Sequence, residues 1–169
     1  MHAQTYPRST HAEFRRIADA NPQSRVEIDA AGTITVTPPA GAMSGHRNAR
    51  LTSVITAWAD AHGYIAFDSS TGFALSDGSI FQPDAAVVAK DAWNALAPEQ
   101  REAFLTIPPV IAIELASQSD RAVLLKAKLR RFRATGTAFV ALIDPYHRSV
   151  WTDGTRPAEF DIDLEAFLT

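Results

Sequence analysis

The sequence predicts a single domain of the α/β or α+β class, in which helices flank a central mixed β-sheet. The chain has 169 residues, the usual length of one domain, so we assign residues 1–169 to a single unit. Apolar residues make up 46% of the chain and charged residues 21%, a composition that supports a packed core and argues against disorder. In the second half, the patterns run strand, strand, helix, strand, an order typical of a mixed sheet.

The first third of the chain predicts a helix, a hairpin and a second helix. Residues 1–9 carry no pattern, so we expect a flexible lead-in. Apolar residues recur at helical spacing from residue 10 until Asn-Pro at 21–22 ends the helix. Residues 25–37 alternate between apolar and polar around a glycine turn, which predicts a β-hairpin. Helical periodicity returns over residues 44–62, and a glycine follows.

The remainder alternates between apolar, β-branched runs that predict strands and two segments of helical composition. The helix with the clearest pattern has Ser-Asp at its start and Gly just after its end. The predicted elements are strands at 64–67, 72–75 and 79–89, a polar peripheral helical insert at 91–104, a buried strand at 110–116, a helix at 119–135, a buried strand at 139–143 and an edge strand at 148–151.

Composition excludes several kinds of site. There is no cysteine, so disulfides, thiolate zinc sites, iron–sulfur clusters and cysteine nucleophiles are ruled out. The formal charge of -3 argues against a generally basic, nucleic-acid-coating surface, although not against a local basic patch. No apolar run approaches the ~20 residues needed to span a bilayer, and the first 20 residues carry no signal-peptide core. We therefore expect a cytoplasmic protein with no membrane partner.

Two carboxylates interrupt apolar strand patterns. Asp84 lies in the middle of the predicted strand SIFQPDAAVVA, and Glu114 interrupts the run VIAIELA. A buried carboxylate must be paired, hydrogen-bonded, protonated or bound to a metal, because an isolated buried charge is prohibitively costly. One interpretation is structural: each acid pairs with its own arginine or faces water at a strand end. The other is that the two acids, on neighbouring strands, belong to one site.

The helix that follows Glu114 adds a basic residue. At about 100° per residue, Lys128 falls inside the arc formed by the large apolar residues Leu124, Leu125, Leu129 and Phe132. Lys128 is thus expected to face the sheet, unless its stem extends past the sheet edge. Two acids and a lysine suit hydrolysis of a phosphate ester assisted by Mg²⁺ or Mn²⁺, in which Lys128 orients the attacking water or offsets charge on phosphate oxygens.

Spaced motifs in the chain resemble one nuclease family. They are, in order, the hairpin VEIDAAGTITVTPP, the strand segment FDSSTGFALSDGSIFQPDAAVVAKDAW, the segment PPVIAIELASQSD and the segment KAKLRRFRATGTAFVALIDPYHRSV. Pro83-Asp84, with Glu114 thirty positions later, is similar to the PD-(D/E)XK nuclease superfamily, and more specifically to the Uma-type (Uma two) putative restriction endonuclease family of bacteria. The resemblance covers roughly residues 11–152.

The resemblance implies a restriction-endonuclease-like core, a divalent cation held by Asp84, Glu114 and the main-chain carbonyl of Leu115, and hydrolysis of DNA. The superfamily places a lysine two residues after the second acid, but this sequence has Ala116 there. The resemblance and the helical position both select Lys128 as the replacement, with Lys126 the other candidate. The resemblance also aligns Glu27 with the family's N-terminal glutamate, either as part of the metal site or as an exposed hairpin residue.

A strongly basic segment follows Glu114. Residues 121–133 carry six positive charges and no acid. They form either a surface that contacts nucleic-acid phosphates or a solvated helix face whose cations lie favourably near its C-terminus. The residues that we assign to phosphate contact are Ser117, Arg121, Lys126 and Arg130.

The sequence therefore predicts an Mg²⁺- or Mn²⁺-dependent endonuclease that acts on DNA. Cleavage of both strands at one position would favour a two-fold homodimer. The alternative is a catalytically inactive relative that keeps the fold and binds nucleic acid or a partner protein, since the displaced lysine and the acidic charge leave room for it.

Overall fold

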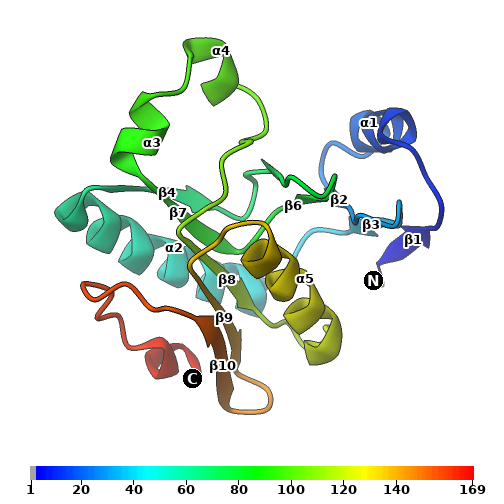
Figure 1. Cartoon of the computed structure of the whole chain (residues 1–169). Helices are drawn as coiled ribbons and strands as arrows, with labels where there is room; N and C mark the ends of the chain where they lie inside the picture. The colour runs from blue at the N-terminus through cyan, green and yellow to red at the C-terminus, as the bar shows by residue number, and fades with distance from the viewer. Residues whose placement is uncertain (1–2) are drawn as a thin grey trace.

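The computed structural model describes residues 3–169 as an α+β fold with two five-stranded sheets (Figure 1). Residues 1–2 of the expected flexible lead-in lie outside the described residues. Residues Gln4–Tyr6, also part of that lead-in, form strand β1, which pairs with a strand of the predicted hairpin. The N-terminal segment thus contributes to a sheet where the sequence showed no strand pattern.

The larger sheet, here called the main sheet, has the strand order β10-β9-β8-β7-β4. Its strands are β4 (Tyr64–Asp68), β7 (Ala85–Ala89), β8 (Ile111–Leu115), β9 (Phe139–Asp144) and β10 (Ser149–Gly154). Strands β8 and β9 are parallel and the other neighbours are antiparallel, so this sheet is mixed, as the sequence predicted. Helix α5 (Ala122–Ala134) makes the connection that a parallel pair requires.

The second sheet, here called the small sheet, is antiparallel with the order β1-β3-β2-β6-β5. Its remaining strands are β2 (Arg25–Ile28), β3 (Ile34–Thr37), β5 (Phe73–Ala74) and β6 (Ile80–Phe81). The predicted N-terminal helix and hairpin are both present, as α1 (His11–Ala20) and β2–β3. The hairpin does not stand alone, however, because β1 and the β5–β6 hairpin extend it into a sheet that α1 covers.

Helices cover both faces of the main sheet (Figure 1). Helix α2 (Ala42–His62) packs on one face through Leu51, Ile55 and Trp58, together with the C-terminal turn Leu164–Phe167. Helix α5 packs on the other face through Leu129 and Phe132. No helix in the described part of the chain is both long and apolar enough to cross a bilayer.

The predicted strand over residues 79–89 is wrong in one respect, because it is two strands separated at Gln82–Asp84. Strand β6 belongs to the small sheet and β7 to the main sheet. Pro83 has no N–H to donate to a ladder, and the backbone of Gln82 bonds to side chains instead of to a strand. Asp84 consequently lies just before β7, where the two sheets meet, and not in mid-strand.

The helix predicted at 119–135 begins three residues later, at Ala122. The carboxylate of Asp120 accepts a hydrogen bond from the Ser117 N–H at 2.8 Å, which closes a turn before the helix and does not cap it. Leu124 also departs from the expected buried arc, since 58% of it is exposed. It lies five residues before Leu129, hence roughly 140° round the helix.

The remaining boundaries differ less. The polar insert at 91–104 comprises two short helices, α3 (Lys90–Asn94) and α4 (Pro98–Arg101), which project from the main sheet (Figure 1). The edge strand β10 continues to Gly154, three residues beyond its predicted end.

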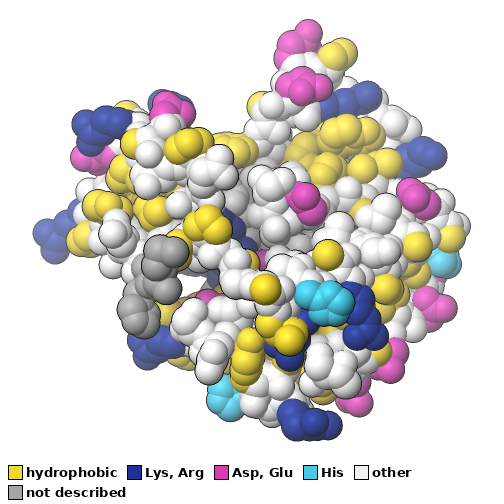
Figure 2. All heavy atoms as spheres, turned by 180° about the vertical axis from the view of Figure 1, so that it is seen from behind, with side chains coloured by type: hydrophobic (Ala, Val, Ile, Leu, Met, Phe, Trp, Pro, Cys, Tyr) yellow, Lys and Arg dark blue, Asp and Glu magenta, His cyan; other side chains and the backbone are white. Residues whose placement is uncertain are grey.

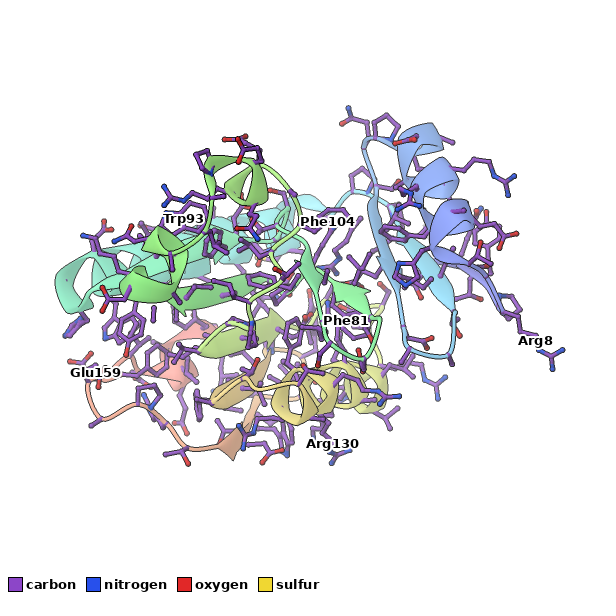
Figure 3. The ribbon with its side chains drawn as sticks, turned by 45° about the horizontal axis from the view of Figure 1, so that its top comes forward. Arg8, Phe81, Trp93, Phe104, Arg130 and Glu159 are labelled. Carbon is purple, nitrogen blue, oxygen red and sulfur yellow. The ribbon has the colours of Figure 1, made fainter. Side chains whose placement is uncertain are left out.

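Phe132 ties α5 to the small sheet, and its removal tests this packing. Its fully buried ring lies 6.2 Å from that of Phe73 and 6.0 Å from that of Phe81, which sits between the small sheet and α5 (Figure 3). We expect Phe132→Ala to lower the free energy of unfolding by about 3–5 kcal/mol, measured by urea denaturation. Leu124→Ala on the same helix is the control, with an expected loss of about 0.5 kcal/mol or less. Equal losses would contradict the described packing.

Candidate functional site

Five charged side chains converge between the two sheets. They are Arg25, Glu27, Asp84, Glu114 and Lys128, here called the charge cluster. They come from β2 of the small sheet, the segment before β7, strand β8 and helix α5, so residues up to 103 positions apart meet in one place. All but Arg25 are buried.

The strand pattern explains why these side chains point the same way. On β2, Val26 and Ile28 pack beneath α1, so the alternate residues Arg25 and Glu27 face the opposite side of the small sheet. On β8, the neighbours of Glu114 pack on the α2 face of the main sheet, so Glu114 faces α5. Both sets of charged groups thus point into the junction between the sheets.

Lys128 is the centre of the cluster. Its Nζ lies 2.6 Å from Glu27 Oε1 and 2.7 Å from Glu114 Oε1, and it donates to the carbonyl oxygen of Gln82 at 2.8 Å. The N–H of Gln82 in turn donates to Glu27 Oε1 at 2.7 Å. Lys128 therefore faces the sheet, and one ammonium group joins α5 to both sheets.

Asp84 has a different set of partners. Its Oδ1 accepts from Arg25 Nη1 at 3.0 Å and from Asn48 Nδ2 at 3.4 Å, while its Oδ2 accepts from the Leu115 N–H at 2.8 Å. The interpretation that an acid pairs with its own arginine therefore holds for Asp84 in this state. It does not hold for Glu114, which shares Lys128 with Glu27.

Sequence reasoning missed Arg25 and Asn48. Arg25 has the same strand parity as Glu27, and this signal could have placed it on the same face. Asn48 precedes Leu51 and Ile55 by three and seven residues, which is the spacing of one helix face. A polar side chain on the buried face of a helix needs a hydrogen-bond partner. For Asn48 this partner is the carboxylate of Asp84.

The environment shifts the protonation of the cluster. Burial, with help from the charges of Asp84 and Glu27, raises the pKa of Glu114 to about 8, because Lys128 and Arg25 offset it only in part. Burial alone would also raise the pKa of Glu27, but Lys128 and Arg25 hold it below its ordinary value. When Glu114 is protonated, the other two carboxylates of the cluster balance the charges of Arg25 and Lys128. When Glu114 ionises, the cluster carries one excess negative charge.

Burial would lower the pKa of Lys128, but Glu114 and Glu27 reverse this effect and raise it above its ordinary value. The ammonium therefore stays charged at neutral pH.

Oxygen atoms of the charge cluster and of the neighbouring Asn48 suit a divalent cation. Glu114 Oε2 and Asn48 Oδ1 are buried and have no hydrogen-bond partner within residues 3–169. Carboxylate and amide oxygens are the ligands that Mg²⁺ prefers, so these atoms fit such an ion. Among the described residues, no three His, Cys, Asp or Glu side chains form a ready-made ligand group. The acids are bridged by Lys128 and Arg25, and Asp84 has to give up a donor before it can bind a metal.

The four residues predicted to contact phosphate lie near the start of α5 or along it. Ser117 is half-buried and its hydroxyl lies 3.3 Å from that of Ser119, whereas Arg121 is exposed. Lys126 Nζ and the guanidinium carbon of Arg130 each lie 5.5 Å from the centre of the Trp151 ring. Arg130 is on the outer side of the helix (Figure 3).

The other basic residues of α5 are engaged within the protein. Arg131 forms an ion pair with Asp77 at 3.6 Å, and Arg133 donates to the carbonyl oxygens of Thr137 and Ala138. The opposite side of the molecule, which faces away from the viewer in Figure 1, has basic and acidic side chains interspersed (Figure 2). Arg121 and Arg130 are exposed and Lys126 is half-buried, whereas Arg131 is exposed but paired with Asp77.

The shifted pKa of Glu114 predicts how stability depends on pH. In the folded protein this pKa is about 8, against an ordinary value of 4.5, so the folded state keeps a proton that the unfolded chain releases. The wild-type protein should thus lose up to about 1.4 kcal/mol of stability per pH unit between these two values. Glu114→Gln has no carboxyl group to titrate at this position. The free energy of unfolding of the variant, relative to that of wild type, should therefore rise between pH 4.5 and pH 8.

The measurement is the free energy of unfolding from urea denaturation at several pH values. The exposed Glu102→Gln is the control and should follow the wild-type protein. A constant difference between Glu114→Gln and wild type from pH 5 to pH 8 would contradict the raised pKa of Glu114.

Comparison with known proteins shows which fold and which family the chain shares. A solved structure described as a putative nuclease belonging to DUF820, from Anabaena variabilis, superposes with a TM-score of 0.68 at 17% sequence identity, and the match covers 85% of this chain and 89% of that one. It shows a shared fold. No curated protein matches the sequence. The family described as Uma2, "Putative restriction endonuclease", matches residues 11–154. The chain therefore belongs to the Uma2 family, as its motifs indicated.

Proposed function

We propose that this protein is an endonuclease that hydrolyses phosphodiester bonds of DNA with the help of Mg²⁺ or Mn²⁺. The observation that carries the proposal is the buried cluster in which Lys128 bridges Glu27 and Glu114 beside Asp84. A buried ionisable group with a strongly perturbed pKa and specific charge partners, such as Glu114, is a candidate functional residue. Membership of the Uma2 family supports the same class of reaction.

The proposed metal ligands are Asp84, Glu114 and the main-chain carbonyl of Leu115. Glu114 offers a buried oxygen without a donor, and the Leu115 N–H already holds the carboxylate of Asp84 beside the same strand. A bound Mg²⁺ or Mn²⁺ would polarise the phosphorus–oxygen bond and make water a better nucleophile at neutral pH. The protonated Glu114 would have to release its proton as the ion binds.

Lys128 is the proposed catalytic cation. Three acceptors, Glu27, Glu114 and the Gln82 carbonyl, fix the position of its ammonium group, and one of these contacts has to be released before Lys128 can donate to a phosphate oxygen. A preorganised cation of this kind stabilises the negative charge that grows on phosphate oxygens in the transition state. Glu27 acts through Lys128 in this proposal and is a positioning residue.

The proposal extends to how DNA is held. Phosphate groups of DNA would contact the accessible polar side chains near the start of α5 and along it, which fix its position without reading its sequence. Cleavage of both strands at one position would favour a two-fold homodimer. We also propose that the protein acts in the cytoplasm. The proposed contact residues are Ser117, Arg121, Lys126 and Arg130.

One observation favours the second candidate, a catalytically inactive module that binds nucleic acid or protein. Asp84 already has three hydrogen-bond donors, among them the cation Arg25, so its carboxylate is satisfied without a metal. Titration with Mn²⁺ separates the two functions, because the inactive module has no need to bind the ion.

The proposed role of Lys128 predicts a loss of cleavage. With Mn²⁺ and plasmid DNA, we expect Lys128→Met to reduce the rate constant for cleavage by roughly 10²–10³-fold. Lys90→Met, at an exposed lysine at the start of α3, should cleave as the wild-type protein does. Circular dichroism must confirm that Lys128→Met is folded, since the change leaves two buried carboxylates without their cation. Equal cleavage by all three proteins would rule out this site.

The proposed phosphate contacts predict a change in salt dependence. If Lys126 and Arg130 each neutralise one DNA phosphate, their joint replacement by glutamine should reduce the slope of log affinity against log salt by about 1.8. The measurement is fluorescence anisotropy of a labelled duplex at several salt concentrations. Arg16→Gln, on the exposed surface of α1, is the control and should leave the slope unchanged. An unchanged slope in the double variant would exclude both residues as phosphate contacts.

A further inference from the structure

Arg25 lies at the edge of the charge cluster and is only partly engaged. A single nitrogen, Nη1, makes both of its hydrogen bonds, to Asp84 Oδ1 at 3.0 Å and to the Gln82 carbonyl at 3.4 Å. The other two guanidinium nitrogens, Nε and Nη2, have no hydrogen-bond partner among residues 3–169, and neither is a buried unsatisfied atom. Each therefore keeps some contact with solvent, in keeping with a side chain that is 23% exposed.

The free N–H groups of Arg25 have the chemistry of a phosphate-binding group. A guanidinium is a planar fork of five donors that matches two oxygens of a phosphate, and it stays protonated at every pH of interest. Its position beside Asp84 also matters. A phosphodiester bound to a divalent cation at Asp84 would lie next to the Arg25 N–H groups that have no partner among residues 3–169.

Arg25 also occupies the oxygen that a metal would use. Asp84 Oδ2 is bound to the Leu115 N–H, so Oδ1 is the oxygen left for a cation, and Arg25 already lies 3.0 Å from it. Two cations at one carboxylate oxygen repel each other, and in a partly buried site water screens this repulsion only weakly. A divalent ion and Arg25 therefore compete for Asp84.

We propose that Arg25 is a phosphate-contacting residue that couples substrate binding to metal binding. Without nucleic acid, Arg25 holds Asp84. When a phosphodiester enters, the guanidinium of Arg25 moves from Asp84 to the phosphate oxygens, and Oδ1 becomes free for the divalent ion. This inference rests on the proposed nuclease function. Because coupling between two binding events is reciprocal, DNA must tighten the binding of the ion, and the ion must tighten the binding of DNA.

The test measures Mn²⁺ affinity with and without DNA. Free Mn²⁺ is followed by electron paramagnetic resonance, in the presence or absence of a short duplex with phosphorothioate linkages, which keep the charge and resist hydrolysis. For the wild-type protein, the duplex should tighten Mn²⁺ binding by roughly tenfold, within the usual range of coupling between sites. Arg25→Gln should bind Mn²⁺ alone roughly fivefold more tightly than wild type, because no guanidinium pairs with Asp84 Oδ1, and the duplex should then add less than about twofold.

The control is Arg16→Gln, which removes an exposed arginine on α1 and should behave as the wild-type protein does. Arg25→Lys is the second variant, for use if Arg25→Gln does not fold. It keeps a cation beside Asp84, so Mn²⁺ binding without DNA should stay close to wild type. A lysine lacks the planar fork, so the gain from the duplex should fall below that of wild type.

The outcomes separate the inference from the proposed function. If Mn²⁺ binds but Arg25→Gln binds it no more tightly than wild type, or the duplex strengthens both equally, Arg25 only joins the two sheets and the inference is overturned. An undiminished gain from the duplex in Arg25→Lys would also overturn it. If neither the wild-type protein nor any variant binds Mn²⁺, with or without DNA, the proposed function fails and the inference fails with it.

Discussion

The ammonium group of Lys128 is the interaction on which the rest of the site depends. It reaches from α5 to Glu27 on the small sheet and to Glu114 on the main sheet, and it bonds to the peptide of Gln82 between them. Its charge is what permits carboxylates from both sheets to be buried side by side. The small sheet is thereby tied to the main sheet by charge as well as by the aromatic contacts of Phe132.

Such a cluster is a poor way to gain stability. Buried ion pairs lose much of their attraction to desolvation, and apolar side chains of similar volume often serve as well or better. In this protein one carboxyl, Glu114, is so poorly compensated that burial pushes its pKa to about 8, and its Oε2 has no hydrogen-bond partner within residues 3–169. A buried group whose charge is poorly compensated within the protein is a candidate functional group. In the function proposed above, a divalent cation would supply the missing compensation.

Much of the fold could be predicted from periodicity, because α2, α5 and the strands of the main sheet bury one face or both. Asp84 and Glu114 stood out as charges within apolar runs, and Lys128 as a cation within an apolar arc. The second sheet could not be predicted, since β1, β5 and β6 have at most three residues each, and the pairings that join β1 and the β5–β6 hairpin to β2–β3 are long-range. For the same reason the sequence did not indicate that Arg25 reaches Asp84. That contact exists only because Pro83 ends β6 and redirects the chain into the main sheet.

The most direct test of the central claim is an anomalous difference map from a crystal of the wild-type protein soaked in Mn²⁺. The account predicts a single strong peak within coordination distance of Asp84 Oδ1 and Glu114 Oε2, with the guanidinium of Arg25 displaced from Asp84. A map with no peak between these carboxylates, or with its strongest peak at another acidic group such as Asp144, would contradict the account.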